Sequence, residues 1–245
     1  MSRKYADGDD LTANRLLATL PEDALAFLKP SLRVGALAHG KVLFEPGDDV
    51  ATTYFPCRAT MASLLIVLGD GQAIEAATIG YEGAIGGVIS SGHKPAFGRA
   101  VVQIPGAAFF IATDRLEEAK QRSPRVADIF SRYSDLLTAQ LMQSVACNAA
   151  HDLQARCCRW LLSAHDRAGA NTVHLTHETL AEMLGVQRTS VSLIARRLSQ
   201  AGMIRYGRGK VEILDRRALE AGSCECYGAV EAHFKAVLPE VAAKT

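Results

Sequence analysis

The sequence predicts an α+β protein built from an N-terminal antiparallel β domain, one long helix and a C-terminal winged helix-turn-helix. Three observations support this fold class. Short apolar strands separated by Gly and Pro fill residues 31–112 at intervals of about ten residues. From Ser123 onward, apolar residues recur at helical spacing without interruption. Two helical segments joined at Gly185 then precede a Gly-rich hairpin.

The composition is that of a soluble globular protein. The chain has 245 residues, of which 49% are hydrophobic and 22% charged, enough for a full core in one or two domains. Its N-terminus is polar and acidic, and no apolar run is long enough to span a membrane, so we expect neither a signal peptide nor membrane contact. The six cysteines suggest no disulfide framework, which makes a reducing cytoplasm the expected location. They are Cys57, Cys147, Cys157, Cys158, Cys224 and Cys226.

The first half of the chain is expected to fold into strands behind a helical leader. We expect residues 1–10 to be disordered. Residues 11–30 should form short helices with a break at Pro21. The predicted strands form an antiparallel sandwich or barrel and cover 41–49, 52–56, 61–68, 72–80, 83–92, 99–106 and 107–112. The loops of this domain could hold a ligand. The alternative is a domain that serves only as a platform for packing and dimerisation.

A short helix over 114–121 and then the long helix come next. Ser123 is a suitable N-cap, Pro124 suits the first helical position, and the helix should run to about Cys147. The apolar face of this helix is broad enough to pack both on its own β domain and on the same helix of a second copy. We therefore predict a parallel dimer helix. The alternative is a helix that packs only on its own domain. The apolar seam comprises Val126, Phe130, Tyr133, Leu137, Leu141 and Ser144, widened by Ile129 and Leu136.

A hinge is predicted over 148–151 and a supporting helix over 152–169, followed by the helix-turn-helix. Thr176 is an N-cap for a helix that ends at Gly185, and a second helix runs from about Gln187 to Gln200. Ala181 supplies a small residue where the helices cross, and Val191, Ile194 and Leu198 face back toward the first helix. The opposite face suits the major groove of DNA, although an ordinary helical hairpin with a solvated face is the alternative. That face carries Arg188, Thr189, Ser192 and Arg196.

The segment 202–214 reads as strand, tight turn and strand, which is the pattern of a wing. Its tip carries Arg208 and Lys210, which we expect to contact phosphates. Residues 185–217 have a net charge of +6 in a chain whose total is +1. Such a concentration of positive charge on a helix-turn-helix and wing indicates a nucleic-acid partner.

After the wing, helices are expected over 215–221 and in the tail, where 225–237 is amphipathic. Cys147 and His151 have the i, i+4 spacing of a metal or redox site at the hinge, although buried cysteines are common in cores. The Cys224–Cys226 pair could be a thiol switch, but its spacing is too tight for a usual zinc pair. We therefore expect no metal site.

This order of parts resembles the bacterial Crp/Fnr family of transcription regulators. The matching stretches cover nearly the whole chain: VLFEPGD (42–48), YFP (54–56), the IGG loop (85–87), RWLL (159–162) and LTHETLAEMLGVQRTSVS (175–192). The resemblance implies a cyclic-nucleotide-binding-like β-roll as sensor and a homodimer formed through the long helix. It also implies winged-helix binding to a two-fold symmetric operator.

The resemblance also implies roles for single residues of the DNA-binding part. Arg188 matches an arginine that reads guanine, whereas Thr189 and Leu193 stand where the cyclic-AMP branch has a Glu and a second Arg. The operator of that branch is therefore not expected here. The positions of Thr176, Gln187 and Ser190 match phosphate contacts, and we expect His177 to contact a phosphate as well.

The sensor departs further from the cyclic-AMP branch. Gly87, after Gly86, replaces the Glu that binds the ribose, and Arg99-Ala100 is the nearest match to the Arg-Ser pair that binds the phosphate. Arg99 could contact an anion or be a plain surface charge, and Tyr133 could cap an effector pocket or pack in the core. Because no cysteine precedes Cys57, an iron–sulfur cluster of the family's kind is not expected. We expect no cofactor, no response to cyclic AMP and an effector that is unknown or absent.

The predicted domains are a sensor (1–118), the long dimerisation helix (119–147), the winged helix-turn-helix (148–222) and a helical tail (223–245). The predicted function is sequence-specific binding of double-stranded DNA by a homodimer, with RNA polymerase as a further partner if the protein is an activator. A redox- or metal-sensing variant of this function is the alternative. An enzyme is not expected, because the β domain has no Ser/His/Asp-like set, P-loop or carboxylate pair.

Overall fold

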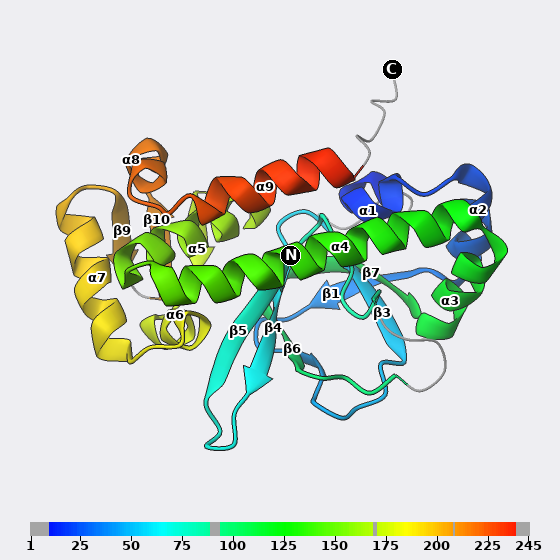
Figure 1. Cartoon of the computed structure of the whole chain (residues 1–245), viewed down its shortest axis with the longest axis horizontal. Helices are drawn as coiled ribbons and strands as arrows, with labels where there is room; N and C mark the ends of the chain where they lie inside the picture. The colour runs from blue at the N-terminus through cyan, green and yellow to red at the C-terminus, as the bar shows by residue number, and fades with distance from the viewer. Residues whose placement is uncertain (1–9, 89–93, 169–170, 208, 239–245) are drawn as a thin grey trace.

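The structure is a computed structural model, and it describes residues 10–88, 94–168, 171–207 and 209–238 (Figure 1). The described chain begins with short helices, η1 (Leu11–Ala13), α1 (Arg15–Ala18), α2 (Glu22–Leu28) and η2 (Lys29–Ser31). The fully buried Asn14 fastens this leader. Its Oδ1 accepts from the N–H of Leu17 at 2.9 Å, and its Nδ2 donates to the carbonyl oxygens of Pro56 and Gly83.

Two antiparallel sheets form the N-terminal domain, which confirms the predicted α+β class. One sheet has the order β1-β7-β3 and the other the order β2-β6-β4-β5. Apolar side chains such as Phe55, Leu65 and Ile111 alternate inward and are almost completely buried. The strands are β1 (Arg33–Leu37), β2 (Val42–Phe44), β3 (Thr52–Pro56), β4 (Met61–Val67), β5 (Ala73–Ile79), β6 (Arg99–Ile104) and β7 (Gly106–Ala112).

The predicted strand over 83–92 is wrong for its described part, because residues 83–88 form a loop with a single bridge, Ile85 to Tyr54. Gly86 has φ +76°, which breaks an extended chain, and a Cβ there would lie 2.7 Å from Val50 Cγ1. Residues 89–92 lie outside the described residues. The sequence analysis also missed β1.

The central helix α4 (Pro124–Ala150) follows α3 (Thr113–Arg122) and crosses the molecule (Figure 1). Ser123 is its N-cap, as predicted. The predicted hinge over 148–151 is wrong for its first three residues, which continue α4 because neither Gly nor Pro interrupts them. The chain turns only at His151, which caps the helix.

The C-terminal part begins with α5 (Leu153–Ala168) and then forms the predicted helix-turn-helix and hairpin. A third strand, β8, was missed; it pairs with β10, giving a sheet of order β8-β10-β9. The tail helix α9 lies along α4 (Figure 1). The elements are β8 (Thr172–His174), α6 (His177–Leu184), α7 (Arg188–Gln200), β9 (Ile204–Gly207), β10 (Lys210–Ile213), α8 (Arg216–Ala221) and α9 (Cys226–Val237).

The helix-turn-helix packs directly on the sensor hairpin formed by β4 and β5. Met61, Leu65 and Ala73 of this hairpin belong to the same buried cluster as Trp160 and Met183. Two polar contacts reinforce the packing: Trp160 Nε1 donates to Glu75 Oε1 at 2.9 Å, and Ser63 Oγ lies 3.3 Å from Met183 Sδ. Within the described part of the chain, no helix is both long enough and apolar enough to cross a membrane.

Candidate nucleic-acid interface

The turn between α6 and α7 has the geometry that the sequence predicts. Thr176 Oγ1 accepts from the N–H of Thr179 at 3.0 Å and so caps α6. Gly185 ends the helix with φ +65° and ψ +40°, the left-handed conformation that residues with a Cβ rarely adopt. The inner faces of the two helices are buried, through residues that include Ala181, Val191 and Leu198.

The outer face of α7 is polar and basic, and it is accessible at the N-terminal end of the helix. Gln187, Arg188 and Thr189 are exposed, Ser190 is half-buried, and Arg196 is exposed two turns further on. The Arg188 side chain is 66% exposed and lies 3.5 Å from Glu178, a pairing between exposed groups that is worth little energy. Leu193 is 51% exposed on the same face, where an apolar side chain could contact a thymine methyl group.

Two predicted contact residues, His177 and Ser192, also join the elements of the domain. Ser192 Oγ donates to the carbonyl oxygen of Arg188 at 3.0 Å, and its oxygen lies 2.9 Å from His177 Nδ1. The His177 ring stacks on Tyr206 of β9 with the ring centroids 4.1 Å apart. Burial, together with the charge of Arg188, lowers the pKa of His177, which favours the neutral ring. His177 and Ser192 therefore position α7 against α6 and the wing.

The wing is fastened beside the start of α6. The N–H of Leu175 donates to the carbonyl oxygen of Gly209 at 2.9 Å, and Tyr206 Oη donates to the carbonyl oxygen of Leu175. Lys210 begins β10 and is exposed, opposite His174 of β8. Arg208, the other predicted wing contact, lies outside the described residues. The wing thus brings Lys210 close to the start of α6, where the neighbouring Gly209 lies beside Thr176.

The sensor domain contains a cavity of about 330 Å³ with a largely apolar lining. Strand residues such as Leu64 and Ile66, the loop residue Gly86, and Leu137 and Leu141 of α4 form its walls. Lys94 also lines it, but the Lys94 ammonium pairs with Asp114. A cavity of this kind suits a small apolar ligand better than a charged nucleotide.

The other predicted effector residues do not line this cavity. Gly87 packs under Phe130, and its carbonyl oxygen accepts from Lys120 Nζ at 2.8 Å. Arg99 Nε donates to Glu45 Oε2 at 2.8 Å. Tyr133 is buried in the core, where its hydroxyl donates to the carbonyl oxygen of Ala84 at 3.0 Å and burial raises its pKa. Among the four predicted residues, only Gly86 is brought to the cavity.

The apolar faces of α4 differ from the predicted seam. Val126, Phe130 and Tyr133 are buried within the chain, so this part of the seam is used by the protein's own domain. An apolar stripe remains exposed in the C-terminal half of the helix, where Met142 is 68% and Val145 71% exposed.

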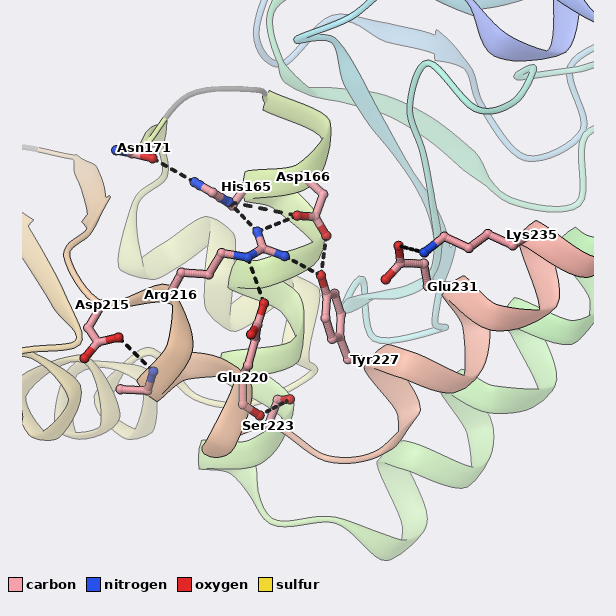
Figure 2. Close-up of polar contacts among 11 residues, drawn as sticks. His165, Asp166, Asn171, Asp215, Arg216, Glu220, Ser223, Tyr227, Glu231 and Lys235 are labelled. Carbon is pink, nitrogen blue, oxygen red and sulfur yellow. Dashed lines mark hydrogen bonds and ion pairs between the residues drawn. The ribbon is translucent and has the colours of Figure 1, made fainter. Parts of the chain in front are cut away.

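Figure 2 shows a polar network that the sequence analysis missed, in which Arg216 of α8 joins α5 to α9. Arg216 donates to Asp166 Oδ1 at 2.6 Å and to Tyr227 Oη at 2.7 Å, and the Tyr227 hydroxyl donates to Asp166 Oδ2 at 2.6 Å. His165 and Glu220 complete the network. It fixes the tail helix to the DNA-binding part of the chain.

Comparison with known proteins shows that this architecture resembles that of Crp/Fnr regulators. Residues 155–221 match the family model of the Crp-like helix-turn-helix domain. The structure resembles FixK2 from Bradyrhizobium japonicum, with a TM-score of 0.67, 16% identity and coverage of 79% of this chain and 98% of that one. No curated protein matches the chain.

Two further solved structures share the fold. A putative transcriptional regulator of the Crp/Fnr family from Eubacterium rectale gives a TM-score of 0.64 at 18% identity, covering 86% of this chain and 98% of that one. CLP of Xanthomonas campestris, described as a c-di-GMP-responsive global regulator, gives 0.63 at 15% identity, covering 79% and 99%. The fold and the helix-turn-helix domain expected from the sequence are thereby confirmed.

Proposed function

We propose that this chain, a Crp/Fnr-type transcriptional regulator by its helix-turn-helix domain and its fold, binds a two-fold symmetric DNA operator as a homodimer. One observation carries the proposal: the N-terminal end of α7 is polar and exposed, and the wing with its exposed Lys210 is hydrogen-bonded beside the start of α6. A helix presented in this way enters the major groove, while a wing tracks the neighbouring phosphates.

The exposed residues divide into two roles. Arg188 reads a base, because a guanidinium can donate two hydrogen bonds to the major-groove edge of guanine. Gln187, Thr189, Ser190 and Arg196 flank it on the same surface. Thr176 and Lys210 contact phosphates beside the groove and set the register of the helix on the DNA.

The second copy binds on the apolar stripe of α4 formed by Met142 and Val145. The protein's own sensor domain and α9 cover the other sides of α4, and this stripe is left open to solvent. Burying it against the same stripe of a second chain removes two exposed apolar surfaces from water at once. The resulting two-fold axis makes the operator symmetric.

The sensor cavity does not take cyclic AMP in this proposal. Its walls are mostly apolar, the Lys94 ammonium that faces it is already paired with Asp114, and Arg99 is paired with Glu45. Burying a cyclic phosphate without a free cationic partner would be costly.

Selection of binding sites from random duplex DNA tests the proposal. The full chain should enrich a two-fold symmetric motif whose half-sites lie about 10 base pairs apart. Adding cyclic AMP should leave the motif and its enrichment unchanged. Enrichment of an asymmetric single site would contradict the homodimer, and enrichment that requires cyclic AMP would contradict the account of the sensor.

A further inference from the structure

Four side chains that can bind metal ions converge where the end of α4 meets the start of α9. Cys147 and His151 come from the end of α4, Cys224 precedes α9, and Cys226 is its first residue. One ligand atom from each of the four lies within 4.8 Å of the ligand atoms of the others. Cys147 Sγ is 3.5 Å from Cys224 Sγ, and Cys226 Sγ is 3.5 Å from His151 Nδ1.

The spacing of these atoms fits one tetrahedral ion. Zn²⁺ binds thiolate sulfur at about 2.3 Å and imidazole nitrogen at about 2.0 Å, so its ligands stand at separations similar to those observed here. An iron–sulfur cluster attaches its ligands to different iron atoms and therefore spreads them more widely than a single ion does. Three thiolates and one imidazole form a common structural zinc set.

The groups around the four residues are arranged as they are around known metal sites. The Glu225 carboxylate lies 3.2 Å from His151 Nε2, which leaves Nδ1 facing the sulfurs, and such carboxylate partners orient metal-bound histidines. The three cysteines are buried. Arg156 lies near enough to Cys147 and Cys224 to interact with their charges, and its buried Nε has no hydrogen-bond partner among the described residues. One cation there would balance the net charge of −1 of three thiolates and Zn²⁺.

The chain on both sides of the Cys224–Cys226 pair is held in place. Ser223 Oγ donates to the carbonyl oxygen of Glu220 at 2.9 Å, and Tyr227 belongs to the Arg216 network (Figure 2). Gln143 Nε2 lies 2.9 Å from Cys226 Sγ. The two sulfurs are therefore oriented toward α4 by the surrounding fold, which a loose tail could not achieve.

We propose that Cys147, His151, Cys224 and Cys226 bind one Zn²⁺ ion that fastens α9 to the end of α4. His151 binds through Nδ1, and the three thiols release their protons as the three Zn–S bonds form, with no change of oxidation state. The sequence analysis expected no metal here because it considered two separate pairs, and residues 77 positions apart complete the set.

Metal content and cobalt spectroscopy of the full chain test the site. Protein purified under reducing conditions without chelator should contain about one zinc per chain. After zinc removal, titrated Co²⁺ should give the visible bands of a tetrahedral ion and the near-ultraviolet bands of thiolate ligation, and added Zn²⁺ should abolish both.

Variants connect these signals to the four residues. Cys224→Ser and Cys226→Ser should lose the tetrahedral cobalt spectrum, whereas Cys57→Ser, which alters a buried cysteine of the sensor domain, should retain it. His151→Ala alters a partly exposed side chain and should fold even if the cysteine variants do not; we expect it to lower zinc affinity at least tenfold.

Several outcomes would overturn the site. They are a wild-type chain that gives no tetrahedral cobalt spectrum, a spectrum unchanged in the Cys224, Cys226 and His151 variants, or a Cys147–Cys224 disulfide in protein kept under reducing conditions. None of these measurements uses DNA, so failure of the metal site and failure of the proposed DNA binding can be told apart.

Discussion

At the scale of single residues, Arg188 is the side chain on which sequence readout depends. It projects from the first turn of α7 with its side chain 66% exposed. In Arg188→Ala we expect a loss of about 1–3 kcal/mol at one base pair of each half-site and relaxed specificity there. Affinities for operators substituted at each position measure this loss. An equal loss on every sequence would make Arg188 a phosphate contact.

Lys210 is expected to act through charge alone. It lies on the wing, exposed and close to the start of α6. Lys210→Ala should weaken binding to all sequences and reduce the slope of log affinity against log salt by about 1, because one fewer phosphate is neutralised. Lys235→Ala, a change on the distant α9, serves as the control. A wild-type slope in Lys210→Ala would remove the wing lysine from the interface.

At the scale of elements, the contact between the β4–β5 hairpin and the helix-turn-helix contains a buried carboxyl group. Burial raises the pKa of Glu75 above its ordinary value, although Ser63 and Trp160 donate hydrogen bonds to it. The folded state therefore binds this proton more tightly than the unfolded state does. The contribution of Glu75 to stability is greatest below its unfolded pKa and is lost as the pH rises through its folded pKa.

Glu75→Gln should therefore unfold at a higher temperature than the wild type at pH 8, and the difference should shrink as the pH falls toward 4.5. Each 1 kcal/mol corresponds to about 2–4 °C for a chain of this size. Thermal unfolding followed by circular dichroism at both pH values measures the difference. If the stability advantage of Glu75→Gln over the wild type grew as the pH fell, folding would lower the pKa of Glu75 and the account would be contradicted.

The apolar stripe of α4 makes its own prediction about assembly. Val145→Glu places a charge on a side chain that is 71% exposed, so the folded chain should tolerate it while the dimer should not. Sedimentation at micromolar concentration should show dimers for the wild type and monomers for Val145→Glu. Arg125→Glu, at the polar end of the same helix, should remain dimeric. A dimeric Val145→Glu would move the interface elsewhere.

At the scale of the whole molecule, features set by neighbouring residues were predictable. Thr176 begins α6 and Gly185 ends it, and both act through interactions with residues a few positions away. Their roles could therefore be predicted from local spacing. The antiparallel strands and the start of α4 were predictable for the same reason. Tyr133 could have faced either the core or a pocket, because periodicity gives the face of a helix but not what packs on it.

Features that depend on distant residues could not be predicted in this way. The packing of α9 on α4 and the convergence of Cys147 with Cys224 join segments 77 positions apart. The contact between His177 and Ser192 joins two helices, and the sequence analysis, which named both residues as DNA contacts, could not predict it. Met142 and Val145 become informative only once the other sides of α4 are known to be covered.

The central claim is that two copies of this chain place two α7 helices in successive major grooves on one face of DNA. Hydroxyl-radical footprinting of the full chain on its selected site tests it most directly. We predict two protected patches related by two-fold symmetry and about 10 base pairs apart, from centre to centre. A single patch, or protection without symmetry, would contradict the account.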